Sequence, residues 1–157
     1  LLAAVQELEK LALQFGTTTV SAEQIDAGNS SHYDVFALND ALLSGDTPHA
    51  LKILHTLKQE GSNALVILGA LTRELRQLAA ASESVAGGSP ASAAMRQLGV
   101  WEKRQPMFSR ALQRLSVTQT RQMVALMGTV DQAVKGMANR DPWNVLETLC
   151  LLVCKPR

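Results

Sequence analysis

Hydrophobic residues recur at helical spacing along the whole chain. Leu1, Val5, Leu8, Ala12 and Phe15 follow one another at intervals of four and three residues, which predicts a helix that ends at Gly16. Similar stripes follow up to the last residues. No segment alternates apolar and polar positions long enough to predict a strand. We therefore predict an all-α fold, a helical bundle-like domain.

Small polar segments divide this pattern into two parts. Ser21-Ala22-Glu23-Gln24 has the form of a capping box and predicts a short helix that stops near Gly28. The next residues, 28–31, are Gly-Asn-Ser-Ser, which cannot contribute to a core and predict a linker. We place the domain boundary here, with residues 1–28 as a short helical piece and residues 29–157 as the main helical domain.

The main domain opens with three predicted helices. The first runs from a cap at Asp34 to residue 44, and the second starts at Thr47-Pro48, with Thr47 as the cap. The third is capped by Ser62 or Asn63. Because residues 65–71 are apolar on most sides, we expect its start to be central and its end to lie at the surface.

The second half of the domain starts with a predicted loop over residues 82–92, which contain Gly87-Gly88-Ser89-Pro90. Further helices are expected over 91–98, from Pro106, from Ser116 or Thr118, and from Asp141-Pro142, with Val100-Trp101 as a small anchor between the first two.

One of these helices carries a regular apolar stripe that includes Met123, Met127 and Met137. A stripe at this spacing is typical of a core face, although methionines also form adaptable partner-binding surfaces. On the same helix Asp131 precedes Lys135 by four residues, which predicts an ion pair on the helix surface.

Composition fits a folded helical domain. The 157 residues are 46% hydrophobic and 18% charged, which excludes intrinsic disorder. The only cysteines, Cys150 and Cys154, lie one helical turn apart in an apolar run, which predicts two reduced, buried thiols and a cytoplasmic protein. No apolar run approaches the ~20 residues of a membrane-spanning helix, so we expect a soluble protein. The first residues include no Met and no basic leader, and we interpret the chain as a piece of a longer one.

Motifs of catalysis and cofactor binding are missing from the sequence. It contains no G-x-x-x-x-G-K-[ST] phosphate loop and no G-x-S-x-G turn. His32, His49 and His55 do not have the spacing of metal ligands, and Cys150 with Cys154 would supply only half of a metal site. We expect no catalytic residue, no metal and no cofactor.

Charge is distributed unevenly along the chain, although the total is only +1. Residues 1–63 carry a net charge of −5, and residues 64–157 carry +6. Within the basic part, the candidate contact residues are arginines: Arg96, Arg104, Arg110, Arg114 and Arg121. They predict either a surface that matches an acidic neighbouring subunit or, as the alternative, a helical nucleic-acid-binding domain that contacts phosphates.

The order of several segments resembles one family, the C-terminal part of the delta subunit of the bacterial DNA polymerase III clamp loader. The resemblance spans essentially the whole chain and rests on these segments: Leu1 to Leu11, Tyr33 to Phe36, Ala41 to Asp46, Ala50 to Leu54, Glu60-Gly61, Val100-Trp101 with Arg104, Asp131 with Lys135-Gly136, and Trp143 with Leu146-Glu147. Each motif alone is weak, but their order and spacing together are specific. Thr47-Pro48 and Gly87-Gly88 are not matched to the family.

This resemblance implies a role in assembly. Residues 1–28 would be the C-terminal piece of an AAA+-type lid domain, and residues 29–157 a collar domain that packs against other loader subunits of the gamma/tau and delta-prime type. The resemblance also implies that the subunit does not hydrolyse ATP itself. The sliding clamp and DNA would be reached only through the full-length protein and its complex, so no clamp-binding or catalytic residue is assigned.

Overall fold

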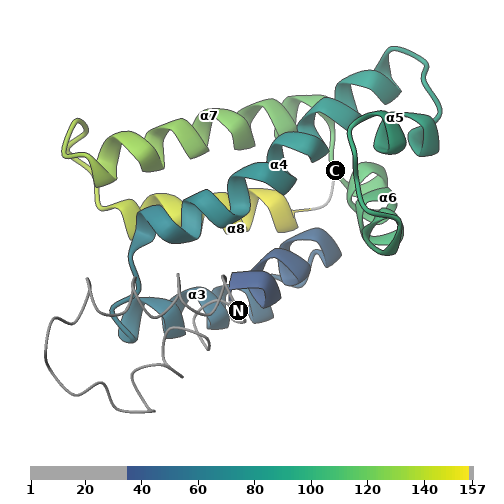
Figure 1. Ribbon diagram of the computed structural model, residues 1–157. Coiled ribbons are helices and arrows are strands. Elements are labelled where there is room, and N and C mark those ends of the chain that lie inside the picture. The colour runs from purple at the N-terminus through teal and green to yellow at the C-terminus, as the bar shows by residue number, and fades with distance from the viewer. Residues whose placement is uncertain (1–34, 156–157) are drawn as a thin grey trace, which may run out of the picture. The chain divides into compact units, whose positions relative to one another are not determined.

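The computed structural model describes residues 35–155, and these residues fold into helices joined by short turns, with no strand among them (Figure 1). Residues 35–44 form the first helix. The others are α3 (Thr47–Gln59), α4 (Ala64–Ala86), α5 (Ala91–Gln97), the 3₁₀ helix η1 (Glu102–Arg104), α6 (Gln105–Arg114), α7 (Val117–Val134) and α8 (Pro142–Cys154). The predicted all-α fold is confirmed.

Several predictions lie outside the described residues. They are the helix ending at Gly16, the helix over residues 21–28, the linker at 28–31 with its domain boundary, and the cap at Asp34. The division into residues 1–28 and 29–157 therefore stays a prediction.

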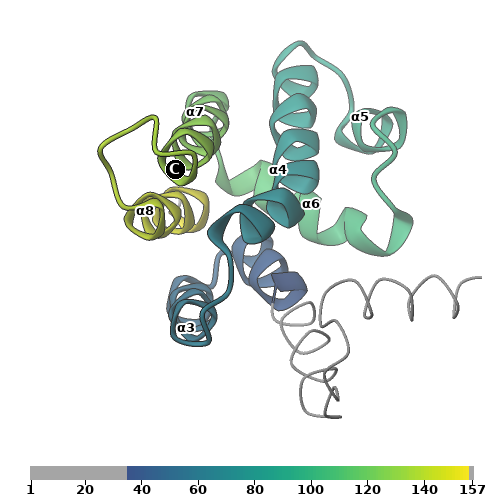
Figure 2. The same ribbon diagram turned by 60° about the vertical axis from the view of Figure 1, so that its left-hand side comes forward.

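The helix α4 is the centre of the described domain. It contacts α7, α8, α5 and α6, while α3 packs against α8 (Figures 1 and 2). Leu71, Leu75 and Leu78 of α4 are completely buried, as is Ala81 one turn further along. Burial of a leucine side chain contributes about 1.5–3 kcal/mol, so this row is a main source of stability.

Three of these helices, α4, α7 and α8, begin at side-chain caps that the sequence predicts. Asn63 accepts from the Leu65 amide at 2.8 Å, and Ser116 forms a capping box with Gln119. Asp141 accepts from the Trp143 amide at 2.9 Å.

The cap of α3 is a correction to the sequence analysis. Asp46, not Thr47, accepts from the His49 amide, at 3.1 Å, and Thr47 is the first helical residue. A carboxylate at this position also interacts favourably with the positive end of the helix dipole.

The helix α4 is amphipathic along its whole length, which corrects the prediction of a central start and a surface-lying end. At its start Ile67 is buried, but Leu65 is 41% and Val66 63% exposed, and the inward-facing residues from Leu71 to Ala81 are fully buried. The helix also continues to Ala86, where a loop from residue 82 was expected, because Ser82 is itself buried against the domain. The loop is confined to residues 87–90.

Cys150 and Cys154 on α8 are free thiols and both are buried, as predicted. Burial is the main cause that raises the pKa of Cys150 to about 12, and burial also raises the pKa of Cys154. In the part of the chain that the structure describes, no helix is both long and apolar enough to cross a membrane.

Replacing Leu75 by Ala tests the central position of α4. We expect Leu75→Ala to lower the free energy of unfolding by about 2–5 kcal/mol, because a fully buried leucine leaves a cavity. The matched control, Leu65→Ala near the exposed start of the same helix, is expected to change it by less than about 1 kcal/mol. Urea unfolding followed by circular dichroism measures both. Equal losses would contradict the burial pattern.

The thiols give a second test of the fold. At pH 8 we expect both cysteines to react with a thiol reagent far more slowly in the native chain than in denaturant, because they are buried and Cys150 is protonated. Since the fold favours the neutral thiol of Cys150, its contribution to stability is complete below the usual Cys pKa and is lost as pH rises toward about 12. Rapid native labelling would contradict this.

Candidate interaction surface

The five arginines singled out in the sequence fall into two groups. Arg96 on α5 and Arg110 on α6 are exposed, and among the described residues neither has an ion-pair partner. The other three make contacts within the domain. Of the five arginines, two are therefore free to contact a partner.

Arg104 joins three segments of the domain. Its Nη2 donates to Glu74 Oε2 at 2.7 Å and lies 2.8 Å from Asp40 Oδ1. Its Nε is 2.7 Å from Glu74 Oε1, an ion-pair contact without a hydrogen bond at that nitrogen. Because Asp40 belongs to the first helix, Glu74 to α4 and Arg104 to η1, directly before α6, the three charges fix the positions of these elements.

Burial and charge act in opposite directions in this cluster. Burial raises the pKa of Glu74 above its usual value, although Arg104 opposes the shift. Burial likewise works against the charge of Arg104, but hydrogen bonds and charge from Asp40 and Glu74 outweigh it and raise the pKa of Arg104. Burying the ionised form of Glu74 is therefore unfavourable at neutral pH, and the charge of Arg104 offsets this free energy. The cluster fixes the positions of the helices more than it stabilises the fold.

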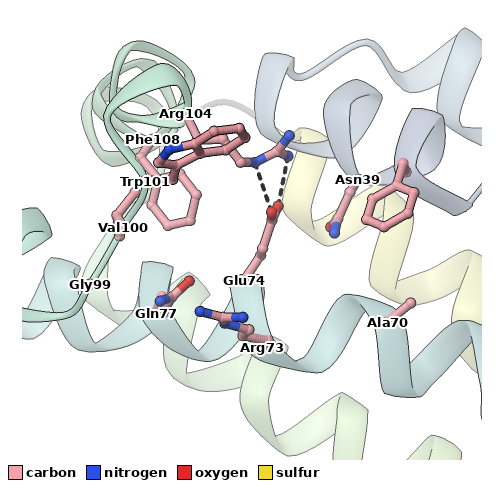
Figure 3. A pocket seen from close by; sticks show the side chains of 11 residues that line it. Asn39, Ala70, Arg73, Glu74, Gln77, Gly99, Val100, Trp101, Arg104 and Phe108 are labelled. Carbon is pink, nitrogen blue, oxygen red and sulfur yellow. Dashed lines mark hydrogen bonds and ion pairs between the residues drawn. The ribbon is translucent and has the colours of Figure 1, made fainter. Parts of the chain in front are cut away.

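A hollow of about 590 Å³ lies beside this cluster (Figure 3). Its lining includes Trp101, Gln77 and Asn39 together with the Glu74–Arg104 pair. The Gln77 side chain is held by a bond to the Leu98 carbonyl at 2.9 Å, and Asn39 Oδ1 is buried without a hydrogen-bond partner. Since two carboxylates neutralise Arg104, its charge is not available to an anion in this hollow.

Trp101 is 66% exposed, while Val100 beside it is buried. Only half of the predicted Val100-Trp101 anchor therefore packs into the domain. Lys103 lies over the Trp101 ring, with Nζ 5.4 Å from the ring centroid. The rest of the indole faces solvent.

Arg114 binds the ends of helices rather than a partner. It donates to the carbonyls of Leu42 at 3.0 Å, Leu43 at 3.2 Å and Val153 at 3.1 Å, at the C-terminal ends of the first helix and α8. Burial lowers the pKa of Arg114 from its usual value. Gly45 allows this approach, because a Cβ there would lie 2.7 Å from the guanidinium, and its φ of +82° also favours glycine.

Arg121 pairs with Glu83 across α7 and α4. Its Nε and Nη2 donate to the two carboxylate oxygens at 2.6 and 2.9 Å. Hydrogen bonding to Arg121 lowers the pKa of Glu83. Because both side chains are exposed, this bidentate pair adds little stability but occupies the arginine.

The methionine stripe is mainly core. Met123 and Met127 are buried, which confirms the preferred interpretation for these two, whereas Met137 lies beyond the end of α7 and is 76% exposed.

The predicted ion pair of Asp131 and Lys135 forms, with 2.7 Å between Oδ2 and Nζ. His49 and His55 are exposed, and His32 lies outside the described residues. Residues 35–155 contain no group of three or more His, Cys, Asp or Glu that could hold a metal ion.

Sequence reasoning did not identify the partners of these arginines. Glu74 lies 30 residues from Arg104, and Glu83 lies 38 residues from Arg121. Periodicity and capping patterns report only neighbours within a helix, so no local signal indicates pairs at this separation. The acceptors of Arg114 are main-chain carbonyls, which every residue has, so no residue type in the sequence indicates them.

Comparison with known proteins gives a consistent result. The family model described as "Processivity clamp loader gamma complex DNA pol III C-term" matches residues 35–157. The chain is 36% identical over 156 residues to the DNA polymerase III subunit delta of Escherichia coli (strain K12), an alignment that covers 98% of this chain and 45% of that protein. It is 25% identical over 165 positions to the same subunit of Haemophilus influenzae (strain ATCC 51907 / DSM 11121 / KW20 / Rd), covering 98% and 48%. The chain thus spans slightly less than half of these relatives.

Replacing Arg114 by Ala separates a structural arginine from a surface one. We expect Arg114→Ala to lower the free energy of unfolding by about 2–3 kcal/mol, because charged donors are lost from three carbonyls. The control Arg110→Ala, on the same helix but exposed, should change it by less than about 0.5 kcal/mol. Urea midpoints measure the difference, and identical midpoints for the two variants would contradict the role of Arg114.

Proposed function

We propose a role in assembly, on the premise that this chain belongs to the family of C-terminal domains of the DNA polymerase III clamp-loader delta subunit, whose model matches residues 35–157. The match confirms the family resemblance found in the sequence. The chain would be a non-catalytic module of the replicative clamp loader that packs against other loader subunits in a collar. In this way the full-length subunit would help to load the sliding clamp onto primed DNA.

The observation that carries the proposal is the 36% identity to a DNA polymerase III subunit delta over 98% of this chain. The all-helical fold is compatible with it, because helix faces are suited to packing against the helices of related subunits. Several large apolar side chains are exposed on different helices, among them Val66, Val124 and Leu151. Such residues on a folded domain favour a partner when they are grouped.

Partners of the module would be loader subunits, specifically those of the gamma/tau and delta-prime type. Residues 1–28 would be the end of a lid domain and residues 29–157 the collar domain. The sliding clamp and DNA would be contacted through the full-length protein and its complex, within the cytoplasmic replication machinery. ATP hydrolysis would belong to other subunits.

Nucleic-acid binding by the basic segment is the less favoured function. Of the five arginines proposed for it, three already pair with carboxylates or carbonyls of the domain. Of these five, Arg96 and Arg110 remain for phosphate contacts, and two charges give weak binding with a shallow salt dependence.

Size-exclusion chromatography with light scattering tests the proposal. The chain is run alone and mixed with each gamma/tau-type and delta-prime-type subunit from the same organism. We expect a mixed species with at least one of them and no stable complex with an unrelated helical protein of similar size. If the chain elutes unmixed in every case, the assembly role is wrong, and anisotropy with primed DNA at increasing salt then tests the alternative.

A further inference from the structure

A groove of about 480 Å³ runs between α4 and α7, and its floor is apolar. Leu68 and Met127 form the floor and are buried, while Leu65 and Val124 stand at the sides and are 41% and 38% exposed. The two helices lie side by side in both views of the domain (Figures 1 and 2). The groove is therefore a surface feature of the most central pair of helices.

Two glycines within helices line this groove, Gly69 on α4 and Gly128 on α7. Glycine inside a helix is unfavourable relative to alanine, so its presence calls for a reason. Neither glycine is required by the domain itself, because a Cβ added at either position would meet nothing within 4 Å. Both have helical backbone and neither has a positive φ. The space that they leave open lies on the outside.

Charge is depleted around the groove. Residues 64–72 of α4 and residues 122–130 of α7 include no charged side chain, although exposed residues occur in both stretches. A surface helix normally carries charge on its outer face. Loss of charge at the centre with charge at the rim is the compositional mark of a protein interface, whereas a nucleic-acid site would need cations.

The charges at the groove stand at its two ends. Asp131 at one end is neutralised by Lys135 at 2.7 Å. Arg76 at the other end is exposed, and no ion pair is formed by it among the described residues. From Leu65 to Arg76 the groove follows about 16 Å of α4, or three helical turns. A partner that complements it would be apolar in the middle, with a carboxylate near Arg76.

We propose that this groove, centred on Gly69 and Gly128, receives one amphipathic helix of another clamp-loader subunit, with an acidic residue of that helix against Arg76. Ridges of one helix fit between two others at interaxial distances of 8–10 Å, and glycines permit the closest approach. The inference rests on the proposed function, and it adds which surface of the chain makes the contact.

Filling the groove tests the proposal. Gly69→Gln and Gly128→Gln place a polar, helix-favouring side chain in open space, so the urea midpoint of the chain alone should stay the same or rise. Isothermal titration with the loader subunit that forms the mixed species should show binding weakened by about 10-fold or more, because close packing is blocked. The control, Ser92→Gln on the exposed side of α5, should bind as the wild type does.

Charge reversal tests the orientation of the partner helix. Arg76→Glu is expected to weaken the same titration by about 5-fold or more and to do so less at high salt, since an ion pair at the rim is screened. The control Lys52→Glu, an exposed cation on α3, should leave the affinity unchanged. If both reversals have the same effect, the carboxylate opposite Arg76 is excluded.

The outcomes separate this inference from the proposed function. If the wild type binds a loader subunit and the glycine variants bind equally well, the groove is not the interface, while the assembly role stands. If the wild type binds none, both fail. If the chain alone is a dimer that Gly128→Gln dissociates, the occupant is a second copy, and the assignment to another subunit is overturned.

Discussion

The Arg114 guanidinium holds together the ends of three helices, and the described domain depends on this point. Arg114 closes α6 and donates to carbonyls at the ends of the first helix and α8. Helix C-termini carry partial negative charge and unpaired carbonyls, so three such ends converge only around a cation with several donors. Gly45 is the matching constraint, because any side chain there would displace the guanidinium.

The helix α4 packs against the interior of the domain on one side and forms part of an uncharged surface on the other. Its inward residues from Leu71 to Ala81 are completely buried, and its first turns, with α7, form the uncharged groove around Gly69 and Gly128. Two acidic residues of α4 lie elsewhere, with Glu74 on Arg104 and Glu83 on Arg121, while Arg76 stands at one end of the groove. The same helix thus supplies the core, the ion pairs that fix its neighbours and one wall of the groove.

Part of the positive charge of this domain serves to connect its helices. Of the five arginines singled out in the sequence, Arg104, Arg114 and Arg121 contact other helices, while Arg96 and Arg110 remain exposed. Exposed cations occur on several helices, but α4 and α7 present an uncharged surface around Gly69 and Gly128.

Periodicity and capping in the sequence by themselves determined the all-α class, the caps at Asn63, Ser116 and Asp141, the pair of Asp131 with Lys135, and two buried thiols. These features depend on residues within about one helical turn, where spacing along the chain is also spacing in space. Tertiary structure alone decided which faces of α4 are buried, that Ser82 continues the helix, and which partners Arg104, Arg114 and Arg121 meet. An apolar stripe has the same sequence pattern whether it packs in the core or against a partner. The sequence likewise does not distinguish a free arginine from a paired one, because both outcomes depend on helices that are distant in the chain.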